Sequence, residues 1–366
     1  MRGALNVDTE LLDSPRPVRA GEQLDAARLA AYLRARLPEL VGPLEVAQFP
    51  AGFSNLTYLV RVGAAEFVLR RPPFGSQVKT AHDVGREFLI LSRLRPVYPK
   101  VPRPVLYCDD LSVLGAPFYL MERVGGVILR ARPPAGAALT PAVMRRLSEA
   151  FIETLVEIHG VAYEAAGLGE LGRREGYVAR QVEGWTRRYF NARTDDVPEI
   201  ERLARWLAEH APKDSDHALI HNDFKYDNVV LAPDDLTRVL AVLDWEMATV
   251  GDPLMDLGTT LSYWVDPDDP AEWQRFGFGL TTRAGNLSRR ELLDTYARRS
   301  GRDISDPVFY FAYGLLKVAG IVQQIYYRYR QGLTTDARFA DLAQLVRASG
   351  RLAQRAVELN RLDRLG

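Results

Sequence analysis

The chain has 366 residues, of which 47% are hydrophobic, and its 47 basic residues balance its 47 acidic residues. This balance gives no reason to expect a nucleic acid or an anionic membrane as a partner, and with Cys108 as the only cysteine no internal disulfide can form. The most apolar stretch, 311–327, is interrupted by Lys317 and two glutamines, so it falls short of the roughly 18 apolar residues of a membrane helix. We expect a cytoplasmic protein with no membrane, nucleic-acid or obligate protein partner.

The N-terminal part of the sequence predicts a tail, a helix and then a series of strands. Residues 1–24 lack an apolar signal core and form a tail, and 24–37 has apolar residues at helical spacing. Short β-prone runs separated by turns then predict an antiparallel sheet, and 82–95 returns to helical spacing. The predicted strands are 44–52, 57–63, 66–72, 103–108 and 117–124.

The clearest change in composition is the Pro/Gly/Ala-rich stretch 130–141, shortly after Gly125 and Gly126. We therefore predict a tail over 1–24, a nucleotide-binding N-lobe over 25–125, and a helical C-lobe over 126–366 that holds a catalytic hairpin and the acceptor site. Residues 217–246 break the helical pattern of the C-lobe because they predict strand, loop, strand, turn and strand. The predicted helices include 141–160, 176–190, 196–210, 307–330 and 336–360. This organisation indicates an α+β fold.

A cluster of polar residues, HNDFKYDN, occupies 221–228 between two apolar runs, and polar loops held by strands are a common way to present chemistry. If the following strands form a hairpin, Asn228 and Asp244 come together, and a carboxylate with an amide oxygen suits Mg²⁺. Asp223 could then accept the proton of an attacking hydroxyl, and Lys225 could neutralise charge on a transferred phosphoryl group. This pattern matches the kinase template H-x-D-x-x-x-x-N followed by a separate metal-binding Asp.

Two stretches, LIHNDFKYDNVVL at 219–231 and VLDWEMATVGDPLMDLG at 242–258, resemble the aminoglycoside-phosphotransferase-like kinases. The resemblance is closest to the branch of bacterial stand-alone phosphotransferases and kinase domains fused to acyl-CoA dehydrogenases, and it extends over about 25–360. It implies a bilobal, protein-kinase-like fold with a small antiparallel-sheet N-lobe and a larger, mostly helical C-lobe. It also implies ATP and Mg²⁺ as cofactors and a small-molecule hydroxyl as the acceptor.

Carried over residue by residue, the resemblance assigns the central roles. Asp223 would be the catalytic base, and Asn228 and Asp244 would hold Mg²⁺. Arg70 stands where most kinases have a lysine, and Glu87 on the following helix would be its ion-pair partner. Whether Arg70 fully replaces the lysine stays open, because its planar fork is not equivalent to an ammonium.

The resemblance also implies nucleotide contacts outside these motifs. The loop Gly52–Phe53–Ser54–Asn55 would cover the phosphates, and since it has one glycine the contact would run through Ser54 and Asn55. Glu122 and Val124 would offer backbone groups to adenine at the interlobe hinge. Asp256 would brace the catalytic loop rather than touch the substrate.

Each assignment has a structural alternative. Lys225 could be a solvated surface lysine, the Arg70–Glu87 pair an ordinary surface ion pair, and 52–55 a plain β-turn. Asp223, Asn228 and Asp244 could form a structural turn network, although two motifs in the right order argue against it.

Three further features favour the structural alternative. We expect His221 to be bonded to backbone and His159 to be packed near a helix end. The motif GLGELG at 167–172 fits the dinucleotide pattern G-x-G-x-x-G, but it follows a helical stretch, whereas that pattern must follow a strand and open a helix.

The sequence says less about the acceptor than about the reaction. From residue 308 onward the sequence has nine basic and four acidic residues, a net charge of +5. This charge favours an anionic acceptor over a polycationic aminoglycoside. Within this segment 323–332 is the part most expected to face a ligand, with Arg328 and Arg330 near Asp223. Given the branch that the sequence resembles, a hydroxyacyl compound or its CoA thioester is the expected acceptor. An aminoglycoside or other antibiotic or metabolite, or a catalytically silent nucleotide-binding regulator, stays as the alternative, and the preference between ATP and GTP and the oligomeric state stay open.

Overall fold

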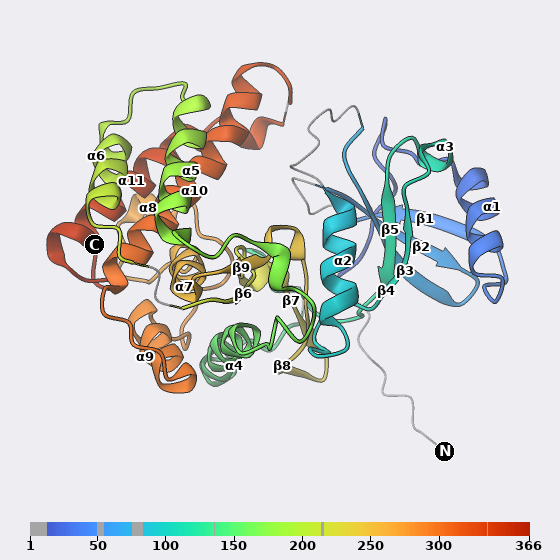
Figure 1. The fold of residues 1–366 in the computed structure, drawn as a ribbon, viewed down its shortest axis with the longest axis horizontal. Coiled ribbons are helices and arrows are strands. Elements are labelled where there is room, and N and C mark those ends of the chain that lie inside the picture. Colours follow the sequence, from blue (N-terminus) through green and yellow to red (C-terminus); the bar gives the residue numbers. More distant parts are fainter. Residues whose placement is uncertain (1–12, 50–54, 75–82, 135, 214–215, 335) are drawn as a thin grey trace.

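The computed structural model describes residues 13–49, 55–74, 83–134, 136–213, 216–334 and 336–366. A sheet-rich N-terminal part lies beside a larger helical part (Figure 1). This is the predicted bilobal α+β, protein-kinase-like fold, and among the predicted elements outside the catalytic region the long helices lie close to their expected positions.

The N-terminal part is a five-stranded antiparallel sheet with strand order β1-β2-β3-β5-β4. Helix α1 (Ala26–Arg36) covers one face of the sheet and α2 (Val84–Leu94) the other (Figure 1). The strands are β1 (Leu44–Gln48), β2 (Leu56–Val62), β3 (Ala65–Arg71), β4 (Pro104–Cys108) and β5 (Phe118–Glu122), with a short α3 (Leu111–Leu114) between the last two.

The two faces of this sheet belong to different hydrophobic cores. On the α1 side Leu29 and Leu33 pack with Tyr58 in a core confined to the N-terminal part. On the α2 side Ile90 and Tyr119 belong to the large core that continues into the helices of the C-terminal part. The sheet is therefore packed directly against the helical part, which fixes the cleft between them.

Long helices make up most of the C-terminal part, and α10 (Pro307–Arg330) packs against several of them. Gly258 and Gly314 let α10 approach α7 (Pro253–Ser262) backbone to backbone, since a Cβ on Gly258 would lie 2.1 Å from the carbonyl oxygen of Tyr310. Of the described residues, only α10 has the length and composition of a membrane span, and 83% of its most apolar stretch is buried inside the protein. The other helices are α4 (Pro141–His159), α5 (Tyr177–Asn191), α6 (Pro198–Glu209), α8 (Ala271–Gln274), α9 (Arg289–Ser300) and α11 (Leu342–Leu359).

Four short strands frame the polar loop 221–228. Strand β6 (Ala218–Ile220) pairs with β9 (Thr249–Gly251), and β7 (Val229–Ala232) pairs with β8 (Asp235–Val242). The prediction that the polar motif sits on the hairpin is therefore wrong in detail, because the motif joins β6 to β7, which belong to different pairs. The β7–β8 hairpin follows the motif, and β8 brings the chain back to the end of the motif at Asn228.

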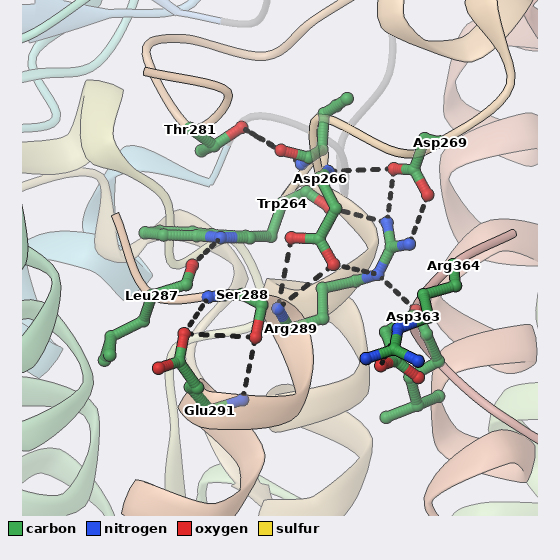
Figure 2. Close-up of polar contacts among 12 residues, drawn as sticks. Trp264, Asp266, Asp269, Thr281, Leu287, Ser288, Arg289, Glu291, Asp363 and Arg364 are labelled. Carbon is green, nitrogen blue, oxygen red and sulfur yellow. Dashed lines mark hydrogen bonds and ion pairs between the residues drawn. The ribbon is translucent and has the colours of Figure 1, made fainter. Parts of the chain in front are cut away.

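A buried ion pair ties the end of the chain to the segment after α7 (Figure 2). Arg289, fully buried at the start of α9, donates to both carboxylate oxygens of Asp269, to the carbonyl of Trp264 at 2.9 Å and to the carbonyl of Leu362 at 2.7 Å. Asp266 accepts the backbone N–H of Arg289 at 3.1 Å. Burial raises the pKa of Asp266 to about 7, although Arg289 opposes the shift.

Candidate active site

Asp256 on α7 holds the start of the polar loop. Its carboxylate accepts the backbone N–H groups of His221 at 2.7 Å and Asn222 at 2.8 Å, and it lies 3.1 Å from Nε2 of His159. Asn222 has a φ of 67°, in the left-handed region that Asn tolerates better than most residues. Asp256 therefore braces the loop without entering the cavity, as the resemblance implies.

His221 is bonded to backbone and is not placed to move a proton. It is fully buried, its Nε2 lies 2.9 Å from the carbonyl oxygen of Leu243, and Nδ1 accepts the N–H of Asp223 at 3.3 Å. Burial lowers the pKa of His221, so the ring is neutral and Nε2 is the donor. The buried His159, bonded to Asp256 and to the hydroxyl of Tyr296, likewise has a structural position.

Asp223 lies at the centre of a network of hydrogen bonds. Lys225 donates to its two carboxylate oxygens at 2.7 and 3.0 Å, and Nδ2 of Asn228 donates to its carbonyl at 2.8 Å and to Oδ2 at 3.1 Å. Burial opposes the charge on Lys225, but the Asp223 carboxylate outweighs it and raises the pKa of Lys225. Lys225 is therefore charged and bound to Asp223, and the solvated-surface alternative for it is wrong.

The hairpin brings Asp244 to the same place. The N–H of Leu243 donates to the carbonyl of Asn228 at 2.8 Å, so the residues at the two ends of the hairpin are neighbours. Asp244 has a φ of 67° and directly precedes the short η4 (Trp245–Met247). Burial opposes its charge, but Arg70 and Lys225 together lower the pKa of Asp244, which keeps it ionised.

Arg70 on β3 connects three carboxylates. Nη1 lies 2.6 Å from Oε1 of Glu87 on α2, and Nη2 lies 2.9 Å from Asp244 and 3.2 Å from Glu246. The side chains of Arg70 and Glu87 are only 7% and 1% exposed, so the alternative of an ordinary surface ion pair is wrong. The pair fixes the sheet, α2 and the Asp244 loop relative to one another.

Glu246, two residues after Asp244, is a site residue that no sequence motif indicated. Its Oε2 accepts Nδ2 of Asn55 at 2.9 Å as well as the contact from Arg70. Asn55, which is 3% exposed, is the last residue of the predicted phosphate loop, so Glu246 links that loop to the Asp244 loop. The other predicted loop residues, Gly52, Phe53 and Ser54, lie outside the described residues.

The predicted hinge residues Glu122 and Val124 both line the cleft. The N–H of Glu122 donates to the carbonyl of Arg103 at 2.8 Å. The N–H of Glu122 is therefore already bonded within the protein.

A cavity of about 550 Å³ lies between the two parts, and most of the predicted site residues line it. Arg70, Asn228 and Asp244 line the same cavity as Asp223 and Lys225. The opposite wall is largely apolar and comes from α5 and α10; it is formed by Trp185, Ile321, Gln324, Ile325 and Arg328. The volume and mixed lining are those of a small-molecule site.

Tyr263, at the end of α7, is a second residue that no sequence motif indicated. It lines the cavity, and the Lys225 ammonium lies 4.9 Å from its ring centroid. Burial, together with the Asp223 carboxylate, raises the pKa of Tyr263 well above its usual range, so the phenol stays protonated. Arg289 donates to the carbonyl of Trp264, the residue after Tyr263 (Figure 2), and this bond helps to fix the position of Tyr263 in the cavity wall.

The basic C-terminal segment reaches the cavity only in part. Arg328 lines it together with Gln324, as expected. Arg330 is not among the described residues that line it and instead donates to the hydroxyl of Tyr326 at 3.1 Å. The expectation is therefore right for Arg328 and wrong for Arg330, because the two residues project from different sides of α10.

The motif GLGELG does not form a dinucleotide site. Its central residues form the short helix η2 (Gly169–Leu171), which follows a turn rather than a strand. This agrees with its rejection on context.

Comparisons with known proteins agree with this geometry. The model of the phosphotransferase enzyme family matches residues 45–293. Acyl-CoA dehydrogenase family member 11 of Gallus gallus is 36% identical over 354 residues, covering 94% of this chain and 44% of that protein. Family member 10 of Mus musculus is 35% identical over 347 residues, covering 94% and 31%. The chain thus spans less than half the length of these curated relatives.

Solved structures show the same fold. A protein from Ralstonia eutropha named as a candidate aminoglycoside phosphotransferase has a TM-score of 0.74 and 30% identity, with 91% of this chain and 99% of that chain covered. Choline kinase from Cryptosporidium parvum has a TM-score of 0.60 at 12% identity, covering 93% and 98%, which supports the fold alone. The resemblance to aminoglycoside-phosphotransferase-like kinases is confirmed, and the chain belongs to the phosphotransferase enzyme family, whose members are small-molecule kinases with hydroxyl acceptors.

Proposed function

We propose that this protein transfers the γ-phosphoryl group of ATP, in a Mg²⁺-dependent reaction, to a hydroxyl of a small anionic molecule with an apolar body. The observation that carries this proposal is that Asp223, Asn228 and Asp244 line one cavity and lie close together through the bonds of Asn228. These side chains are the base and the metal ligands of the kinase template.

The donor groups suit a hard cation. Nδ2 of Asn228 is committed to Asp223, so its Oδ1 is the atom available to a metal, and Asp244 offers an ionised carboxylate on the same wall. Asn228 and Asp244 would therefore hold Mg²⁺, which when bound neutralises charge on the phosphate oxygens. Arg70 carries a permanent positive charge on this wall.

The nucleotide would lie against the sheet. Glu122 and Val124 line the outer part of the cavity, where an adenine would meet backbone groups at the end of β5. Arg70 and Asn55 occupy the phosphate end, next to Asp244 and Glu246. The proposed cover from Gly52, Phe53 and Ser54 rests on the family resemblance.

Asp223 would act as the base. As the acceptor oxygen attacks the γ-phosphorus, the hydroxyl proton passes to a carboxylate oxygen of Asp223 and the bond from phosphorus to the ADP oxygen breaks. Lys225 and Asn228 hold that carboxylate in one orientation, so its contribution is positioning as much as basicity. Lys225 would also offset negative charge near the transferred group.

The far wall of the cavity argues for the acceptor class. Trp185, Ile321 and Ile325 give an apolar surface, and Arg328 adds a positive charge at its edge. An acyl chain with a hydroxyl and an acidic group fits this pairing, so a hydroxyacyl compound or its CoA thioester is our first choice. An aminoglycoside or another antibiotic or metabolite is the alternative acceptor, and a silent nucleotide-binding regulator is the alternative without catalysis.

The experiment is a transfer assay read by mass spectrometry. The protein is incubated with ATP, Mg²⁺ and separate panels of hydroxyacyl-CoAs, free hydroxy acids and aminoglycosides, with Asp223→Asn as the control. A phosphorylated acyl product that is absent with Asp223→Asn supports the proposal. A phosphorylated aminoglycoside alone would refute the acceptor class, and ATP binding with no product from any panel would favour the regulator.

A further inference from the structure

Lys317 is a charged residue inside the core. It lies in the middle of α10, is 1% exposed, and its ammonium lies 5.8 Å from the ring centroid of Trp185. Among the described residues no carboxylate lies within ion-pair distance of Nζ. A buried charge is costly unless it is well bonded, so the partners that Lys317 does have indicate why the position holds a lysine.

Both hydrogen bonds of Lys317 go to Asn222, the residue before Asp223. Nζ donates to the carbonyl oxygen of Asn222 at 2.6 Å and to its Oδ1 at 3.1 Å. The N–H of Asn222 is bound by Asp256, and Nδ2 donates to the carbonyl of Met247 at 3.1 Å. Every polar group of Asn222 is therefore bonded, and Lys317 supplies the partner for both of its oxygens.

This bonding holds Asn222 in an uncommon backbone conformation. With a φ of 67° the residue turns the chain so that the next side chain, Asp223, points into the cavity. Left-handed conformations of residues other than glycine persist when the surroundings hold them. A change at Asn222 would re-aim Asp223, because the two share a peptide bond.

We propose that Lys317 is a positioning residue for phosphoryl transfer, whose ammonium clamps Asn222 and thereby aims the carboxylate of Asp223 at the acceptor. The proposal rests on the role proposed for Asp223. Ile321 and Arg328 follow on the same helix and line the acceptor wall, so one rigid helix sets both the wall and the base. A displacement of about 1 Å at such a site can lower a rate about 100-fold.

The charges around Lys317 give the clamp a pH dependence. Burial is the largest influence and lowers the pKa of Lys317 to about 8; Asp256 and Asp223 oppose this shift, whereas Lys225 and Arg188 add to it. The ammonium is present below that pH and is lost above it. Because hydrogen bonds from a charged donor are stronger than those from a neutral amine, kcat should fall as the pH rises through about 8.

The first test compares Lys317→Met with a matched substitution on the same helix, Gln323→Met. Gln323 is 2% exposed and donates to the carbonyl of Ala192 and to Thr194, away from the catalytic loop. Lys317→Met should lower kcat about 10- to 100-fold with KM for ATP unchanged, and should speed hydrogen exchange in 221–225. Gln323→Met should leave both kcat and that exchange unchanged.

A second measurement keeps the proposal testable if Lys317→Met does not fold. Wild-type kcat is followed from pH 7 to 9.5 while circular dichroism verifies the fold, and Lys317→Arg, whose charge does not titrate, is run beside it. The proposal predicts a fall of about threefold or more in the wild type and none in Lys317→Arg. A flat wild-type profile, or a folded Lys317→Met with wild-type kcat, would overturn it. Absence of wild-type turnover would count against the proposed function instead. Hydrogen exchange in 221–225 would then be the test of whether Lys317 holds Asn222 in place.

Discussion

Removing the Arg70 guanidinium tests the buried Arg70–Glu87 ion pair, which lies at the proposed nucleotide-phosphate end of the site. In Arg70→Met the Glu87 carboxyl group, whose side chain is 1% exposed, would lose the partner 2.6 Å away and be left unpaired in the core, where burial already raises its pKa. Breaking a buried pair by removing one partner costs about 3–5 kcal/mol. Asp244 and Glu246 add little to this cost, because at 30% and 20% exposure they retain access to water.

A second substitution separates stability from binding. In the double variant Arg70→Met/Glu87→Met no charge is stranded, and replacing a buried pair with apolar residues is often neutral. We expect the double variant to regain most of the stability lost in the single variant. ATP binding should stay weak in both, because neither has the Arg70 guanidinium beside Asp244.

The assay is urea unfolding followed by tryptophan fluorescence, with ATP affinity measured by calorimetry on the folded protein. Glu87→Met alone is the matched control, since its guanidinium loses Glu87 but keeps Asp244 and Glu246 as partners. If Arg70→Met lowers the free energy of unfolding by less than about 1 kcal/mol, the Arg70–Glu87 pair contributes no more than a surface ion pair. That result would contradict its role as a buried, stabilising pair. Wild-type ATP affinity in the double variant would contradict the role of Arg70.

Two further predictions concern charge elsewhere. The raised pKa of Asp266, about 7 against its usual 3.8, means that the stability it contributes is present at low pH and lost as the pH rises from about 4 to about 7. Asp266→Asn should therefore raise the free energy of unfolding at pH 8 by about 1–3 kcal/mol and flatten its pH dependence in urea titrations; equal stabilities at pH 8 would refute this. Arg328→Glu should raise KM for an anionic acceptor about tenfold with KM for ATP unchanged, and Arg330→Glu, outside the cavity lining, should change neither in steady-state assays; equal effects of the two would refute the assignment of Arg328.

Local sequence patterns predicted the fold and the inner end of the site. Helices such as α6 and α11 carry apolar residues at helical spacing, and that periodicity depends only on near neighbours. Asp223 and Asn228 lie in one loop, so their spacing appears in the sequence as a recognisable motif. The hairpin then placed Asp244 near Asn228, because β7 pairs with β8 and the N–H of Leu243 donates to the carbonyl of Asn228.

The contacts that sequence reasoning missed join distant segments. Lys317 meets Asn222 across 95 positions, and Glu246 meets Asn55 across 191. Neither contact has a local pattern, because each depends on how α10 and the sheet pack around the catalytic loop. The pairing of β6 with β9 was missed for the same reason, because β9 begins only at Thr249, after the whole β7–β8 hairpin.

In the proposed mechanism Asp223, Asn228 and Asp244 form one site with a base and two metal ligands. Mn²⁺ binding, measured by electron paramagnetic resonance with a non-hydrolysable ATP analogue, tests it most directly in Asp223→Asn, Asn228→Leu and Asp244→Asn. The account predicts that Asn228→Leu and Asp244→Asn weaken Mn²⁺ binding about tenfold or more, whereas Asp223→Asn keeps it and still abolishes transfer. Wild-type Mn²⁺ affinity in both ligand variants would contradict the account.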